Sequence, residues 1–126
     1  MNQHQHHEEL IGGVFEQLKE IFEKSEQAIY AYLDDKHKVC NQNFASLLGY
    51  KSPDEWAKVE DSFPDVLVAE KSQDTLVRTY RNAMEKMVGS TIKVTWKKQS
   101  GGTVDTTVIL VPIAFQGHLF ALHFVS

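Results

Sequence analysis

The residues best suited to chemistry lie at the N-terminus, where His4, His6 and His7 precede Glu8 and Glu9. Imidazole and carboxylate groups are both ligands for divalent metals, so this segment has the composition of a loose metal site. Residues 1–7 are polar and without periodicity, however, which predicts a disordered N-terminus. A disordered segment does not hold ligands in place, and we assign no metal site from the sequence.

The other reactive groups are isolated. Cys40 is the single cysteine, so it cannot form an internal disulfide, and we expect a small buried side chain and not a reactive thiol. Asp34 and Asp35 are adjacent, which favours turn formers over an acid–base pair. We expect His123, near the C-terminus, at the surface or in an interface and not as a ligand. The sequence has no catalytic triad pattern and no phosphate loop, so we predict no catalytic residues and no enzyme.

Length and composition fit one globular domain. The chain has 126 residues, 42% of them hydrophobic, and a net charge of −4 with scattered lysine and arginine, which argues against nucleic-acid binding. No apolar run approaches the roughly 20 residues that span a bilayer, and no secretion signal opens the sequence. We therefore expect a soluble, cytoplasmic protein that contacts neither membrane nor nucleic acid.

Residues 8–27 are predicted to form an amphipathic helix, although Gly12 and Gly13 weaken its first turns. Seven apolar residues recur in it at helical spacing: Leu10, Ile11, Val14, Phe15, Leu18, Ile21 and Phe22. Four of them step by four, three and four, as in a coiled-coil seam: Ile11, Phe15, Leu18 and Phe22. This seam predicts a homodimer interface, while the remaining apolar residues would pack on the domain itself.

The rest of the chain alternates in period as an α+β domain does. Residues 28–33 and 38–40 are predicted to form a hairpin, and residues 92–97, 104–115 and 118–125 a three-stranded meander. Between them we expect helices at 41–50, after Ser52 and Pro53, and at 69–88, with an irregular turn at 61–65. The last two strands are almost continuously apolar, so both faces of the sheet should be covered.

The segment 41–50 carries a family resemblance. Asn41, Phe44, Leu47 or Leu48, Gly49 and Tyr50 stand at the spacing of a segment that follows the second strand in PAS sensory domains, and the order of elements over 28–125 also resembles that family. The resemblance implies a PAS-like domain at residues 28–126, with a five-stranded antiparallel sheet in the order 2-1-5-4-3 and helices on one face. It implies a sensory, signal-transducing module that binds a small ligand or a partner protein, with a leading helix that mediates dimers and relays signals.

No cofactor follows from the resemblance. The reactive-cysteine segment of flavin-binding photosensory PAS domains is absent, and no histidine lies between His37 and His118 to ligate haem from the long helix. A ligand pocket, if present, would have Tyr80 and Trp96 as polar groups; the alternative is that the same side chains fill the core. Its predicted lining is Tyr32, Phe44, Leu48, Trp56, Leu76, Tyr80, Met84, Val94, Trp96, Val108, Leu110 and Leu122.

A second hypothesis is a small-molecule enzyme or carrier with a cone-like α+β fold, as in the ketosteroid isomerase and nuclear-transport-factor families. Those folds curve a sheet around an apolar cavity that usually contains an acid. No carboxylate stands among the predicted inward positions. An aspartate or glutamate at the base of a deep pocket, next to Tyr80, would favour this hypothesis.

Overall fold

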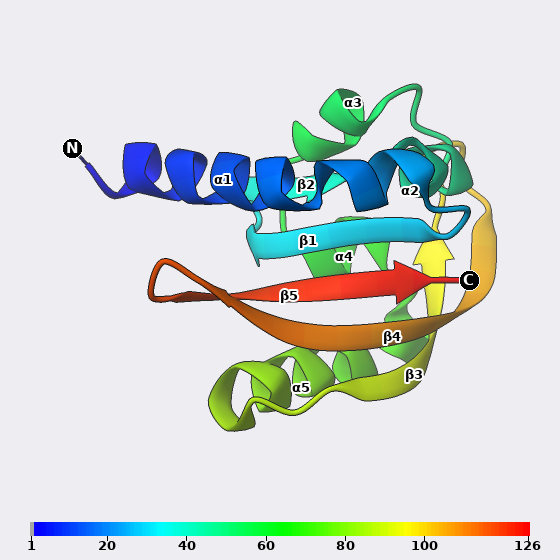
Figure 1. Cartoon of the computed structure of the whole chain (residues 1–126). Coiled ribbons are helices and arrows are strands. Elements are labelled where there is room, and N and C mark those ends of the chain that lie inside the picture. Colours follow the sequence, from blue (N-terminus) through cyan, green and yellow to red (C-terminus); the bar gives the residue numbers. More distant parts are fainter. Residues whose placement is uncertain (1) are drawn as a thin grey trace.

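An antiparallel sheet of five strands forms the centre of the structure, which is a computed structural model that describes residues 2–126 (Figure 1). The strand order β2-β1-β5-β4-β3 confirms the predicted topology, and β1 and β5 pair in the middle of the sheet. The strands are β1 (Ala28–Asp34), β2 (His37–Cys40), β3 (Ser90–Lys97), β4 (Thr103–Phe115) and β5 (His118–Val125).

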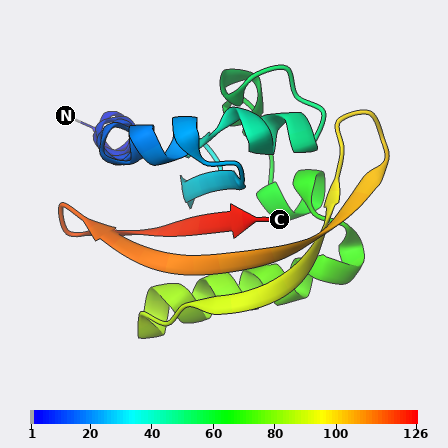
Figure 2. The ribbon, with the colours of Figure 1, turned by 45° about the vertical axis from the view of Figure 1, so that its right-hand side comes forward.

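Helices cover both faces of this sheet. In Figure 2, α1 (Gln3–Lys24) and α5 (Glu70–Lys86) lie on opposite sides of β4 and β5. Three short helices pack on the same side as α5, namely α2 (Gln42–Leu47), α3 (Pro53–Ala57) and α4 (Phe63–Leu67). Among the described residues, no helix is both long and apolar enough to cross a bilayer.

The two faces of β1 show how the covering arises. Side chains alternate along a strand, so Tyr30 joins the core beneath the short helices while Ile29 and Ala31 join the core beneath α1. Both cores contain fully buried residues, which explains why β1 and β5 read as nearly continuous apolar runs. The prediction that both faces are covered is confirmed.

The leading helix begins earlier than predicted. Asn2 caps it: the Asn2 side chain accepts a hydrogen bond from the Gln5 N–H at 2.8 Å, and the Gln5 side chain accepts one from the Asn2 N–H at 3.3 Å. This reciprocal capping box satisfies two backbone donors, so the helix runs over Gln3–Lys24 and not 8–27. The predicted disorder over residues 1–7 is therefore wrong for residues 2–7, while Met1 lies outside the described residues.

Gly13 has a packing role in this helix. A Cβ atom placed there would lie 2.7 Å from Cε1 of Phe115, near the end of β4. The missing side chain lets the ring of Phe115 approach the helix backbone. This packing offsets the free-energy cost of placing a glycine inside a helix.

The central helices follow their local signals closely. The Asn41 and Ser52 side chains cap α2 and α3, Gly49 turns the chain after α2 with φ of 85°, and Pro53 stands in the first turn of α3. The irregular turn predicted at 61–65 is instead the short helix α4, which accommodates Pro64 because proline fits the first turn of a helix.

Candidate functional site

A cavity of about 220 Å³ lies on the side of the sheet that α2 to α5 cover, among β1, β5, α4 and α5. Of the twelve side chains predicted to line a pocket, three lie here: Tyr32, Leu76 and Tyr80. The sequence analysis missed the other six, which are Tyr30, Asp35, Phe63, Pro64, Val77 and His123.

Two buried polar atoms at this cavity have no hydrogen-bond partner. They are the hydroxyl oxygen of Tyr30 and Nδ1 of His123, whose rings stack with centroids 3.9 Å apart and planes inclined by 9°. A buried polar atom without a partner costs about 1–3 kcal/mol, so native proteins rarely keep one without a role. Both residues line the cavity, so a molecule that enters it lies against the side chains that carry these atoms.

Both groups are electrically neutral. Burial lowers the pKa of His123 to about 3. Hydrogen-bonding backbone groups of Ala121 and Tyr30 have a smaller, opposite effect, because they favour the protonated imidazole. Burial, with a smaller contribution from Tyr32, raises the pKa of Tyr30 well above its usual value. A neutral imidazole has one donor and one acceptor nitrogen, and the cavity therefore suits an uncharged ligand.

Asp35 lies at the edge of the cavity but is already engaged. Its Oδ1 accepts hydrogen bonds from the Tyr32 hydroxyl at 2.8 Å and from the Phe63 N–H at 3.2 Å. Burial, followed by the hydrogen bond to Asp35, raises the pKa of Tyr32. This carboxylate ties β1 to the start of α4. Asp35 lines the cavity together with Tyr80, a feature of the second hypothesis, but the strand order β2-β1-β5-β4-β3 is the one that the family resemblance implied.

Most of the other predicted pocket residues fill the core completely. Tyr30 contacts the rings of Phe44, Trp56 and Trp96 at centroid distances of 4.6, 5.7 and 5.7 Å. Seven predicted lining residues are at most 1% exposed in this packed cluster, namely Phe44, Leu48, Trp56, Val94, Trp96, Val108 and Leu110, and Met84 packs against it. These eight residues therefore fill the core and do not line the cavity beside Tyr30 and His123.

Three predictions about individual side chains are corrected. The indole N–H of Trp96 donates to Thr106 Oγ1 at 2.8 Å, so it is not free to orient a ligand. Leu122 does not line the pocket, because it packs beneath α1 on the other face of the sheet. His123, which we expect at the surface or in an interface, is only 2% exposed within the chain itself, since on β5 it shares the face of Ala121 and Val125.

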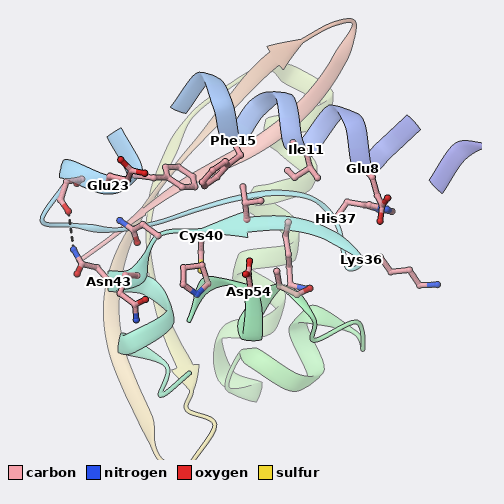
Figure 3. Close-up of a pocket in the computed structure, with 18 residues that line it drawn as sticks. Glu8, Ile11, Phe15, Glu23, Lys36, His37, Cys40, Asn43 and Asp54 are labelled. Atoms are coloured by element: carbon pink, nitrogen blue, oxygen red, sulfur yellow. Dashed lines mark hydrogen bonds between the residues drawn. The ribbon is translucent and has the colours of Figure 1, made fainter. Parts of the chain in front are cut away.

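A larger groove of about 760 Å³ lies outside the core, between α1 and the helices α2 and α3, along the edge strand β2 (Figure 3). Ile11 and Phe15 form its apolar side, and Asn43 and Asp54 lie across from them. Among residues 2–126, the buried polar atoms without a partner are those of Tyr30 and His123 and the indole nitrogen of Trp56, and none of these residues lines the groove. The smaller cavity, which Tyr30 and His123 line, is therefore the better candidate for a specific ligand. Cys40 also lines the groove. It is 1% exposed, which confirms the expected burial, and this burial raises the pKa of the thiol to about 12.

No protein-family model matches the chain, and no curated protein matches it in sequence. Solved structures do match in fold. The PAS domain of a protein from Colwellia psychrerythraea has a TM-score of 0.69 at 16% identity, over 90% of this chain and 95% of that one. A PAS domain from a two-component sensor histidine kinase has a TM-score of 0.65 at 15% identity, over 91% and 96% of the two chains.

A Rhodobacter sphaeroides LOV protein is also similar, with a TM-score of 0.68 at 14% identity over 91% of this chain and 66% of that one. At these identities the likeness is one of fold. The chain has the PAS fold that the segment 41–50 predicted, and this fold is typical of sensory and signalling proteins.

Proposed function

We propose that this domain is a non-catalytic sensory module that binds a small, uncharged and mostly apolar molecule in the cavity beside Tyr30 and His123. The observation that carries the proposal is the pair of buried polar atoms without partners on residues that line a mostly apolar cavity. A ligand that bonds to the hydroxyl and to the imidazole nitrogen would remove the cost of leaving them unpaired. At about 220 Å³ the cavity exceeds the roughly 150 Å³ that holds benzene, so a single substituted ring fits.

A ligand in the cavity can affect the position of α1 through strand β1. Tyr30 faces the cavity, and its neighbours Ile29 and Ala31 pack in the core beneath α1. A ligand that shifts β1 at Tyr30 therefore shifts the surface on which α1 rests. We infer that α1 passes the signal on, to a second copy of the chain or to a signalling partner protein.

A binding experiment with phenol and benzene tests the cavity. Phenol should bind the native protein more tightly than benzene does, because its hydroxyl reaches the unpaired atoms. In Tyr30→Phe or His123→Phe, phenol affinity should fall by about 5- to 10-fold, the worth of one hydrogen bond, while benzene affinity stays the same. Titrations followed by ¹H–¹⁵N NMR measure both constants.

Tyr50→Phe is the matched control for this experiment, because Tyr50 is also buried but does not line the cavity. It should leave both affinities unchanged. Failure of either probe to shift the resonances of cavity residues, or an equal loss of phenol affinity in Tyr50→Phe, would contradict the proposal.

We also propose that α1 mediates a homodimer. Within the predicted seam, Ile11 and Phe22 are buried against the chain's own sheet at 8% and 3% exposure, while Phe15 and Leu18 are only half-buried. Ile21, next to this outer side, is 50% exposed. The part of the seam available to a second copy is therefore Phe15 and Leu18, extended by Ile21.

Leu18→Asp should convert the dimer to a monomer, because it puts a carboxylate into the apolar contact between two α1 helices. Sedimentation velocity at tens of micromolar measures the change. Gln17→Asp adds the same charge at the preceding, exposed position and should leave the dimer intact. A monomeric native chain at this concentration would refute the proposal.

A further inference from the structure

Five of the six histidines meet at one end of the molecule, and His123 is the exception. His4, His6 and His7 come from the first turns of α1, His37 from the start of β2, and His118 from the start of β5. Ring centroids of His4 and His37 are 4.8 Å apart, those of His7 and His37 5.4 Å, and those of His6 and His118 5.0 Å. The capped helix α1 thus brings His4, His6 and His7 to the sheet, although the sequence predicted a disordered N-terminus there.

We propose that His7, Asp34 and His37 form a binding site for a divalent transition-metal ion that fastens the start of α1 to the β1–β2 turn. Nδ1 of His37 lies 2.7 Å from Oδ1 of Asp34, and Nδ1 of His7 lies 3.0 Å from Oδ2 of the same carboxylate. The three ligand atoms all lie within 4.8 Å of one another. Tetrahedral coordination with bonds of about 2.0–2.1 Å places ligand atoms about 3.3 Å apart, so a bound ion would lengthen both N–O separations and replace the two hydrogen bonds.

The surroundings of His37 match those of a metal-bound histidine. Such a histidine almost always donates its second ring N–H to an acceptor that fixes the ring. Here Nε2 of His37 lies 2.9 Å from Nδ1 of His4, and Nε2 of His4 lies 3.2 Å from Oε1 of Glu8. With Nδ1 of His37 on the metal, its Nε2–H donates to His4, and the Nε2–H of His4 donates to Glu8. His4 and Glu8 are therefore outer partners and not ligands.

The carboxylate is oriented in the same way. Oδ1 of Asp34 also accepts a hydrogen bond from the backbone N–H of Lys36 at 3.0 Å. The side chains of His37, His7 and Asp34 are 5%, 17% and 38% exposed, so the site has a protected side and an open side. The open side gives the ion a path in and leaves room for water ligands.

The donor set selects the class of metal. Two imidazole nitrogens and one carboxylate oxygen suit zinc, nickel, cobalt or copper, whereas magnesium and calcium prefer oxygen ligands throughout. A bound ion would hold the N-terminal end of α1 in place, and metal supply would then control the helix on which signal output depends. This site and the cavity share no residue, so each can fail independently of the other.

Calorimetric titration of the full chain with zinc chloride tests the site. We expect one ion per chain, and no binding of magnesium. Loss of an outer partner typically costs about 10- to 100-fold in metal affinity, so Glu8→Gln should weaken binding by at least about tenfold and His7→Gln, Asp34→Asn and His37→Gln by more than about 100-fold. Cobalt, used as a second probe, should show the visible absorption of a site with nitrogen and oxygen ligands.

The control variant is His6→Gln, which removes a histidine from the same helical turn without touching the three ligands. It should bind zinc as the native chain does. Because His37 is buried, each variant is first compared with the native chain by circular dichroism without metal; His7→Gln and Asp34→Asn alter more exposed side chains and decide the matter if His37→Gln does not fold. Equal losses in His6→Gln and His7→Gln, unchanged affinity in Asp34→Asn, or no zinc binding at all would overturn the proposal in favour of a hydrogen-bonded histidine cluster.

Discussion

Replacement of Asn41 by alanine is expected to lower the free energy of unfolding by about 3–5 kcal/mol, because it leaves buried backbone groups without partners. Oδ1 of Asn41 accepts from the N–H groups of Ile29 and Phe44, both at 3.0 Å, and its Nδ2 donates to the Gln27 carbonyl at 2.8 Å. The residue is 4% exposed, so water does not replace these bonds. Urea denaturation followed by tryptophan fluorescence measures the loss.

Two further variants make this prediction specific. Asn41→Asp keeps the acceptor oxygen and loses the donor, so we expect a smaller loss than with alanine. Asn43→Ala removes exposed hydrogen bonds to the carbonyls of Ser25 and Glu26 and should cost less than about 1 kcal/mol. Equal stabilities of Asn41→Ala and Asn43→Ala would show that the buried amide does not hold this junction together.

His123 should make the fold weaker in mild acid. Its pKa is about 3 in the folded protein and 6.5 in the unfolded chain, so on acidification from neutral pH the unfolded state takes up a proton first. Folding is thus opposed progressively as the pH falls from about 6.5 towards 3, and the stability is fully present above 6.5. Between pH 7 and pH 5 the free energy of unfolding should fall by about 2 kcal/mol through this residue.

His123→Phe isolates this contribution. Phenylalanine can keep the stack on Tyr30 and cannot take up a proton, while the other five histidines remain. The quantity to compare is the change in unfolding free energy between pH 7 and pH 5, measured by urea denaturation of both proteins. The same change in the variant as in the native chain would mean that His123 is protonated without unfolding.

The parts of the fold that follow local rules were predictable. Asn41 before an apolar helix, Gly49 after it and Ser52 before Pro53 each act through neighbouring backbone groups, and the structure places caps and turns there. The alternation of apolar residues predicted the strands, and their order in the sheet was implied by the family resemblance of the segment 41–50 and of the element order. The capping box of Asn2 and Gln5 is an equally local signal, and it predicts the early start of α1 that the pattern of apolar residues does not show.

The site depended on information that local patterns do not contain. Whether aromatic rings fill a core or leave a cavity is decided by contacts between residues far apart in sequence, as for Tyr30 and His123. In an almost continuously apolar strand, the sequence does not show which side chains point to which face of the sheet. For this reason Leu122 was predicted to line the pocket but packs beneath α1, and His123 was not predicted on the face of the pocket. The histidine cluster likewise joins residues of α1, β2 and β5 that are far apart in sequence, and only the docked α1 brings them together.

The hydrogen bonds from Asn41 and Asn43 to residues 25–27 hold the junction between α1 and β1 in place. A helix of 22 residues is about 33 Å long, so a tilt of about 10° around this junction moves its far end by about 6 Å. The far end is the one that rests on His37 and Asp34. A small change in the angle of α1 at this junction would therefore cause a large displacement of its N-terminal end. The contacts of His4 with His37 and of His7 with Asp34 oppose that displacement.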